Sequence, residues 1–386
     1  MKRIHSIDFA RGLVMIIMAL DHTRDFLHTD ALTQNPTNLA TTTPILFFTR
    51  WITHFCAPFF VFLSGVSAYL SLKNRANTGE SRRFLLSRGI WLVILEFTVV
   101  NFFLWFDIHF RTLIFEVIAT IGCGFIILSF LYKLSPKIAG IIGLILIFGH
   151  DATSSIMVAN PVLNFLGALF LGRAAFPLTP NLLLIIGYPI LPWLGIMLAG
   201  FACGRLFDLS AETRRKRFIQ LGGAAICLFI LLRGANIYGD PSPWAVQKNA
   251  VFTLLSFINY SKYPPSLCFT LVTLGGLLLL LAISEKWENK ATKIVSVYGK
   301  TPLFYFLIHL AVIHVLMVVM VFAQGYQPSD LVFGTAKFGR PASGSGIPLP
   351  WVYAVWLGVV IVMYPLCRSY GRYKINHPEK TWLRYL

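Results

Sequence analysis

Long apolar runs recur through the whole chain, and they constrain its fold more than any other feature. A helix needs about 20 apolar residues to cross roughly 30 Å of hydrocarbon. Ten such runs are present, and they cover residues 5–24, 48–72, 88–106, 112–132, 137–156, 182–203, 218–236, 264–284, 300–323 and 350–368. The sequence therefore predicts an all-α integral membrane protein, a bundle of about ten transmembrane helices.

The composition agrees with this class of protein. The chain is 56% hydrophobic and only 13% charged, whereas soluble domains are about 25% charged. Its formal net charge of +17 is also typical of proteins that bind nucleic acid, but here Lys and Arg gather in short clusters between apolar runs. Such clusters are the positive-inside pattern. We therefore expect a lipid bilayer around the chain and no nucleic-acid partner.

The basic clusters also predict the orientation. They follow alternate spans, at residues 73–88, 133–137, 205–217, 286–300 and 368–384. Together with Lys2 and Arg3 they place both termini in the cytoplasm. The remaining loops, 25–47, 107–111, 157–181, 237–263 and 324–349, are then outside. One polytopic domain, residues 1–386, accounts for all of this, with a short re-entrant or interfacial helix expected at 161–172.

The first span carries charges that lipid does not tolerate without a reason. In the stretch "DFARGLVMIIMALDHTRDFLH" (8–28), Arg11 and His22 are separated by eleven positions. On a helix they point within about 20° of each other and lie roughly 16 Å apart along the axis. Ionisable groups within a span usually face a bundle interior or a wet cavity. We expect one polar stripe, on which Asp25 holds an imidazole nitrogen of His22.

Other polar residues in the spans are candidates for the same cavity. We expect His54 to line an outer vestibule, and Glu116 to orient the catalytic histidine or the acceptor. A mid-membrane carboxylate such as Glu96 is costly, but the sequence names no partner for it. Arg233 has two interpretations, binding an anionic sugar or a phosphate outside, or extending its charge to the interface.

Several motifs resemble a known family. An Arg followed eleven positions later by a His on the first helix is similar to the signature of membrane-bound acyltransferases that modify sugars. The "APFFVFLSGVSAYL" stretch (57–70) resembles their second-helix element. The whole arrangement most resembles the branch that contains heparan-α-glucosaminide N-acetyltransferase and its bacterial relatives. Later elements that agree are "YPILPWLGIMLAGFACG" (188–204), "YPPSLCFTLVTLG" (263–275) and "GKTPLFYFLIHL" (299–310).

This resemblance implies acetyl transfer across a membrane, from cytoplasmic acetyl-CoA to a sugar amine or hydroxyl on the periplasmic or lumenal side. His22 would be the base or a transient nucleophile. Arg11 would meet the pantetheine or phosphates of CoA, or pair with Asp8. The heparan-type enzymes place their histidine in the loop after the first helix, which makes His28 a rival to His22.

Three further residues are assigned to the donor side of this reaction. Ser64 and Gly65 are small enough for a cofactor to approach closely, although plain helix packing explains them too. His309, in "YFLIHL", is the third, as a residue of the cavity.

Two other functions remain open at this stage. Ten spans with buried charges also suit a carrier or flippase for a sugar or lipid-linked glycan, and a non-catalytic partner or sensor is the third alternative. The six cysteines show neither CxxC nor Cys/His spacing, so we expect no disulfide framework and no metal. A bacterial plasma (inner) membrane is the expected location, and the sequence leaves a homo-oligomer open.

Overall fold

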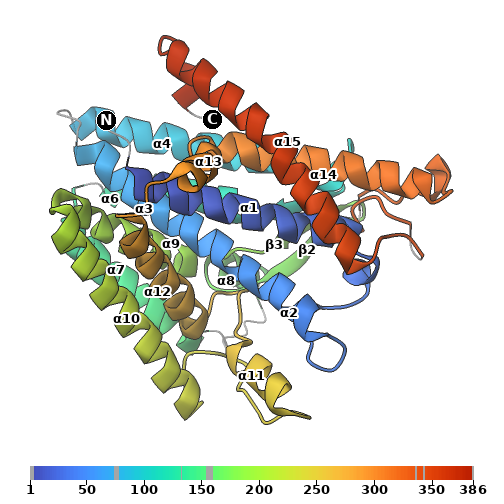
Figure 1. Ribbon diagram of the computed structural model, residues 1–386, viewed down its shortest axis with the longest axis horizontal. Helices are drawn as coiled ribbons and strands as arrows, with labels where there is room; N and C mark the ends of the chain where they lie inside the picture. The colour runs from blue at the N-terminus through green and yellow to red at the C-terminus, as the bar shows by residue number, and fades with distance from the viewer. Residues whose placement is uncertain are drawn as a thin grey trace.

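The computed structural model describes residues 4–73, 78–131, 133–153, 160–334, 337–341 and 344–384. It is mostly helical, which confirms the predicted all-α membrane fold (Figure 1). Helices occupy all ten predicted spans: α1 (His5–Leu27), α2 and α3 (Pro44–Trp51 and Cys56–Lys73), α4 and α5 (Thr78–Leu95 and Asn101–Trp105), α6 (Val117–Leu131), α7 (Pro136–Gly149), α9 (Ile190–Cys203), α10 (Ala211–Ala235), α12 (Leu267–Ser284), α14 (Pro302–Ala323) and α15 (Leu349–Asn376).

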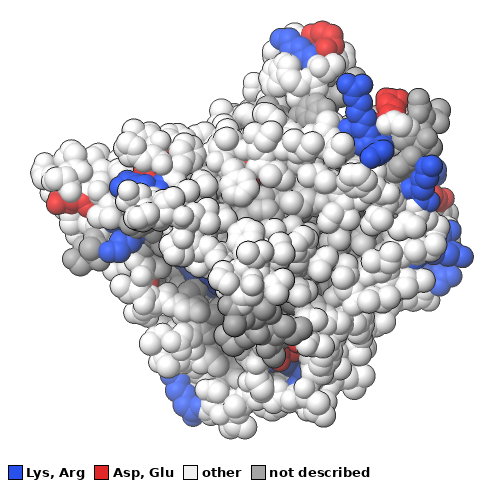
Figure 2. All heavy atoms as spheres, turned by 180° about the vertical axis from the view of Figure 1, so that it is seen from behind, with Lys and Arg blue, Asp and Glu red and all other residues white. Residues whose placement is uncertain are grey.

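In the described part of the chain, eight helical segments are long and apolar enough to cross a membrane. The two other predicted spans are α1, whose apolar run is interrupted by charges, and α6, which has 15 residues. Large apolar side chains such as Ile145 of α7, Leu231 of α10 and Ile361 of α15 are exposed on the surface. Figure 2 shows one face on which Lys, Arg, Asp and Glu lie mainly at the margins, leaving a broad uncharged middle. Such a surface suits contact with lipid.

Helix α1 lies inside the bundle, which explains how it carries charges. It packs against α3, α12, α13 (Lys290–Gly299), α14 and α15 (Figure 1). Most of its residues are buried, Asp8, Asp21 and Arg24 among them. Because protein rather than lipid surrounds these groups, other side chains can neutralise them.

The loops gather on two sides, as the charge pattern predicts. On one side, Arg214 donates to Glu285 at 2.8 Å, Ser6 donates to the same carboxylate at 3.2 Å, and Lys73 pairs with Asp208 at 2.7 Å. These contacts join the N-terminus to the segments after α3, α9 and α12. We call this the inner side, since the positive-inside rule predicts that it faces the cytoplasm.

The remaining loops contact one another on the opposite side, which we call the outer side. The Thr29 N–H donates to the Ile347 carbonyl at 3.1 Å, and the Asn259 side chain donates to the Thr37 carbonyl at 3.0 Å. Two short helices lie in these outer segments, α8 (Pro161–Phe170) and α11 (Ala250–Ile258). A helix at the position of α8 confirms the short element expected at 161–172, and its re-entrant or interfacial position stays a prediction.

A small sheet at the outer side corrects the predicted starts of two spans. Strand β1 (Thr112–Phe115) pairs in parallel with β3 (Leu182–Ile186), in the register Thr112↔Leu183 to Phe115↔Ile186. Strand β2 (Ala174–Thr179) pairs antiparallel with β3 on its other edge. Both β1 and β3 were included in predicted helices, because short apolar runs look the same in strands and helices.

Two local distortions interrupt helices that the sequence predicted as continuous. A 3₁₀ turn (Ile52–Phe55) separates α2 from α3. A π-helical segment, Glu96–Val100, separates α4 from α5, and the Asn101 N–H bonds to the Glu96 carbonyl five residues back. π-Helical turns are rare and frequently occur at functional sites. Hydropathy does not distinguish them from α-helix.

Glycines allow α3 and α9 to pack with backbones in contact. A Cβ added to Gly65 would lie 2.0 Å from the Met197 carbonyl oxygen, and one added to Gly200 would lie 2.0 Å from the Phe62 carbonyl oxygen. Small residues at such crossings let membrane helices approach closely. The structure therefore gives Gly65 a packing role rather than the predicted contact with a cofactor.

This packing predicts that Gly200→Ala lowers the free energy of unfolding by about 1–3 kcal/mol, because a backbone carbonyl cannot move aside as a side chain can. The measurement is the melting temperature of the detergent-purified protein. Gly358→Ala on α15 is the matched control, since no heavy atom lies within 4 Å of a Cβ built there. Equal melting temperatures for the two variants would contradict the close α3–α9 contact.

Candidate functional site

Three cavities lie in series from the inner to the outer side, and the polar stripe of α1 runs along the first two. The inner cavity, of about 330 Å³, contains Arg11, and the middle chamber, of about 170 Å³, contains His22. Phe60, Val117 and Phe306 line both. The structure therefore places Arg11 and His22 in two neighbouring cavities that share part of their walls.

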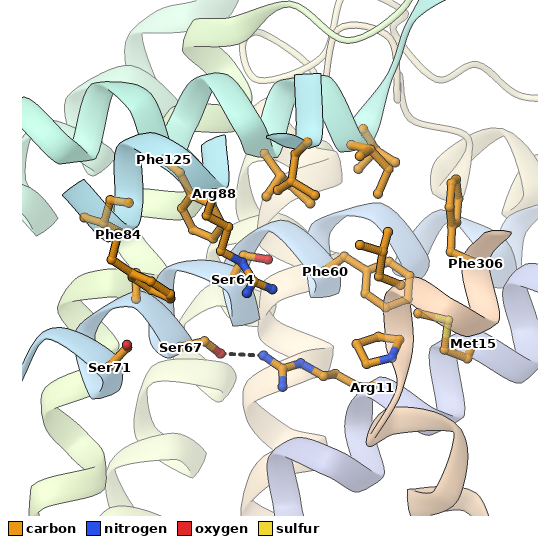
Figure 3. A pocket seen from close by; sticks show the side chains of 18 residues that line it. Arg11, Met15, Phe60, Ser64, Ser67, Ser71, Phe84, Arg88, Phe125 and Phe306 are labelled. Carbon is orange, nitrogen blue, oxygen red and sulfur yellow. Dashed lines mark hydrogen bonds between the residues drawn. The ribbon is translucent and has the colours of Figure 1, made fainter. Parts of the chain in front are cut away.

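The inner cavity combines two arginines with a row of hydroxyls and apolar walls. Figure 3 shows Arg11 of α1 and Arg88 of α4 reaching in from different helices, with Ser64 and Ser67 of α3 between them. Arg11 donates to the Leu63 carbonyl at 3.1 Å and to the Ser67 hydroxyl. The serines follow helical spacing, which puts them on one face of α3. Ser64 lies in the cavity wall, and its predicted contact with a cofactor stays a prediction.

In the middle chamber, His22 is fixed by a second histidine. His22 Nδ1 lies 2.8 Å from His309 Nε2, and His309 Nδ1 lies 2.8 Å from the Tyr305 carbonyl oxygen. A carbonyl only accepts, so His309 carries its proton on Nδ1. In a neutral pair, His309 Nε2 then accepts from His22 Nδ1, and the lone pair of His22 is on Nε2.

This contact corrects the predicted partner of His22. Asp25 was expected to hold the imidazole, but its carboxylate pairs instead with Arg24 at 2.5 Å. Asp25 does line the chamber. His309 is fully buried and is absent from the lining of all three cavities. It therefore holds the His22 ring by a hydrogen bond, on the side away from the cavity. The prediction that His309 itself contacts a cofactor is not supported by this position.

Some charged side chains in the chamber form ion pairs with one another, and others do not. Asp21 pairs with Arg24 at 2.9 Å and with Arg50. Glu116 and Lys262 also line the chamber, and neither makes a hydrogen bond or ion pair through its side chain within the described residues. Lys262 is only 8% exposed, so its ammonium faces the cavity rather than open solvent. The chamber therefore offers one unpaired carboxylate and one unpaired ammonium to a bound molecule.

The outer vestibule, of about 640 Å³, lies next to the chamber and shares Arg50, Lys262 and Tyr263 with it. Lys262 lies 5.0 Å and Arg173 lies 5.4 Å from the centre of the Tyr263 ring. His54 is in the vestibule wall, as predicted. The other lining residues are mostly amides and hydroxyls, Asn35, Thr37, Asn38, Ser242, Asn259, Tyr260 and Ser261.

Like Gly65 and His309, two further predicted residues, His28 and Arg233, are absent from the linings of these cavities. His28 follows the last turn of α1, and its carbonyl accepts from Arg340 at 2.8 Å. Burial, with the positive charges of Arg24 and Arg340, lowers the pKa of His28 despite the carboxylate of Asp30.

Arg233 is 2% exposed and donates to four backbone carbonyls, those of Ser242, Ser256, Phe257 and Asn259. It also lies 3.6 Å from Asp240. Every interaction holds the outer loop, so the geometry supports neither of the predicted roles for Arg233.

The sequence analysis missed the cations Arg50, Arg88 and Lys262. Arg88 was interpreted as a marker of topology, and Arg50 is near the start of a span, where interfacial anchors are common. A signal was present for Lys262, since it is one of few lysines in loops predicted to be outside. Its burial in a wall shared by two cavities is visible only in three dimensions.

Fold and site together define an integral membrane protein with a histidine in the middle one of three neighbouring cavities. The family model described as heparan-α-glucosaminide N-acetyltransferase, catalytic, matches residues 3–238, more than half of the chain. The chain belongs to this family of acetyltransferases, which confirms the predicted acyltransferase over a carrier or sensor. No curated protein matches the chain. Lys262 and His309 lie beyond the matched residues.

The histidine pair predicts that His309→Leu lowers the rate of acetyl transfer by about 10²-fold or more, because His22 loses the acceptor that fixes its tautomer. His309→Gln should lose less, since an amide oxygen also accepts from His22 Nδ1. The measurement is kcat for acetyl transfer in purified protein. His314→Leu is the control, because His314 lies on the same helix but bonds to the Phe103 carbonyl. A Leu variant as active as this control would contradict the role.

Proposed function

We propose that the protein transfers an acetyl group from acetyl-CoA on the cytoplasmic side to an amine or hydroxyl of a sugar on the opposite side, at His22. The observation that carries the proposal is the row of three neighbouring cavities, with His22 in the wall of the middle one. A donor and an acceptor that stay on different sides of a membrane need such a path. Family membership supplies the reaction, acetyl transfer.

The inner cavity suits the donor. Its arginines are matched to phosphate groups, since a guanidinium presents several donors in a planar fork. Its apolar walls and serine hydroxyls suit the pantetheine arm, which alternates methylene and amide groups. An arm bound there extends towards Phe60 and Phe306, the residues shared with the chamber of His22. The donor would thus remain on the inner side while its thioester reaches the histidine.

The chemistry follows from the lone pair on His22 Nε2. A neutral imidazole can take the proton of the acceptor as it attacks the thioester, or it can attack the thioester itself and carry the acetyl group briefly. The buried His309 serves both routes, because it accepts from Nδ1 and stabilises the positive charge that develops on His22. No metal is needed for either route, since a thioester is already activated.

The outer vestibule suits a sugar. Its amides, hydroxyls and tyrosines can hydrogen-bond to the hydroxyls of a sugar ring, and Tyr260 and Tyr263 offer aromatic faces. Lys262 and Arg173 would stabilise negative charge on the acceptor or on the tetrahedral intermediate. We further propose a bacterial plasma membrane as the location of the protein.

The first test uses inside-out membrane vesicles that contain glucosamine, with acetyl-CoA added outside. Wild type should release CoA and form N-acetylglucosamine, and His22→Ala should lose about 10²-fold or more of this rate. His28→Ala should keep its activity within about threefold, because His28 lies outside the three cavities. Loss in His28→Ala alone would assign the chemistry to the loop. Wild-type vesicles that neither bind nor consume acetyl-CoA would contradict the proposed function.

A second test concerns the donor site. Arg11→Ala and Arg88→Ala should each raise the KM for acetyl-CoA about 10- to 100-fold, because a charge-assisted hydrogen bond to phosphate is lost. The KM for the acceptor should stay unchanged. Arg83→Ala is the matched control, since Arg83 lies on the same helix as Arg88 and is exposed. If all three variants have the wild-type KM, the donor does not bind in the inner cavity.

A further inference from the structure

We propose that Glu116 is the group that binds the acceptor in the middle chamber and takes the proton that its amine or hydroxyl loses on acetylation. This inference rests on the proposed function and assigns its second proton-transfer group. It is carried by the pairing of the charges in the chamber and by the way in which the fold fixes the backbone around Glu116.

The pairing of charges selects Glu116 among the chamber's carboxylates. Asp21, Asp25 and Glu116 all line it. Asp21 is held by Arg24 and Arg50, and Asp25 is held by Arg24. A carboxylate in an ion pair is a poor base, because protonation breaks the pair. Within the described residues Glu116 makes no such contact, and its side chain lies in the chamber wall.

The charged groups around Glu116 lie too far away to occupy its carboxylate oxygens, which can therefore accept hydrogen bonds from a ligand. Charges that act on it include those of Lys262, Asp25, Arg173, Arg50 and Glu96, and none of the cations is close enough to form an ion pair. Lys262 and Arg50 lie between the chamber and the vestibule. An acceptor that enters past them therefore meets Glu116 in the same chamber as His22.

The fold holds Glu116 from both sides. Strand β1 ends at Phe115 and helix α6 begins at Val117, so Glu116 is the single residue between them. The Phe115 carbonyl accepts from the Gly187 N–H at 3.0 Å. On the other side, the Glu96 carboxylate accepts from the Ala119 N–H at 2.8 Å.

Two features that the reaction itself does not use provide this support, namely the buried carboxylate of Glu96 and the π-helical segment. Glu96 is fully buried and caps the N-terminus of α6 from the neighbouring π-helical segment. Asn101, at the end of that segment, bonds to both backbone groups of Ile114, at 2.7 and 3.0 Å. A buried carboxylate and a π-helical segment are both costly for stability. Their shared effect is to fix the β1–α6 junction.

On the route through acetyl-His22 the reaction needs a second base, because His22 has one lone pair available. If His22 carries the acetyl group, its Nε2 is bonded to carbon and cannot take a proton. The acceptor nitrogen or oxygen then forms its bond to the acetyl carbon, the bond from that carbon to Nε2 breaks with its electron pair returning to nitrogen, and the acceptor proton passes to Glu116. The products are the acetylated sugar, neutral His22 and protonated Glu116, which returns its proton to water.

The test measures acetyl-CoA binding and acetyl transfer to glucosamine separately, in the purified full-length protein. Glu116→Gln should lower kcat for transfer about 10²- to 10⁴-fold and leave the Kd for acetyl-CoA within about threefold. At pH values below the pKa of the acceptor amine, its residual rate should increase about tenfold for each unit by which the pH is raised, because only the free amine reacts. Formate should restore part of the activity of Glu116→Ala. Glu288→Gln, at an exposed position paired with Lys293, is the control.

The outcomes separate this proposal from the one on which it rests. If wild type binds and consumes acetyl-CoA while Glu116→Gln transfers acetyl at a rate within about threefold of it, Glu116 is not the base and only this inference falls. If Glu116→Gln also loses acetyl-CoA binding, and formate restores nothing to Glu116→Ala, Glu116 is structural and the inference is again wrong. If wild type consumes no acetyl-CoA, the proposed function fails and the role of Glu116 fails with it.

Discussion

The cost of placing charge in a hydrocarbon layer is the constraint on which the rest of this structure depends. Helix α1 contains Asp8, Arg11, Asp21, Arg24 and Asp25, and a helix of this kind facing lipid would be expelled or would drag water into the bilayer. The fold meets the constraint by surrounding α1 with five other helices and by supplying Arg50 from outside it. The result is a row of partly polar cavities inside an apolar protein, with His22 in the middle one.

Much of this architecture could be predicted from the sequence, because hydropathy and charge pattern report directly on transfer between water and lipid. Helices are present at all ten predicted spans, eight of the described helical segments are long and apolar enough to cross a membrane, and the loops gather on two sides of the bundle. The ends of the spans were less accurate. The Thr112–Phe115 and Leu182–Ile186 segments form strands, and nothing local distinguishes an apolar strand of five residues from a helical turn. Their pairing is a tertiary effect.

The candidate site was predicted only in part, again because contacts between distant parts of the chain are not visible in the local sequence. Helical periodicity correctly relates Arg11 to His22, since both are on one helix. It does not reach the partner of His22, because His309 lies 287 positions away. Asp25 was the nearest local candidate, but local spacing ignored the competing attraction of Arg24. Gly65 shows a further ambiguity, as a small residue permits a cofactor and a helix backbone equally well, and here the backbone of α9 occupies the space.

The π-helical segment between α4 and α5 has a consequence for how this site is encoded. Its hydrogen bond from Asn101 to Glu96 spans five residues instead of four, so the segment contains one residue more than an α-helix would need. Deleting a single residue there would turn everything after it by about 100° about the helix axis. Asn101 would then leave Ile114, and Glu96 and the β1–α6 junction would no longer be held together. The geometry of the chamber therefore depends on the number of residues in this segment as well as on the side chains of the chamber. A relative with one residue fewer in the segment could keep every polar residue and still lack the site.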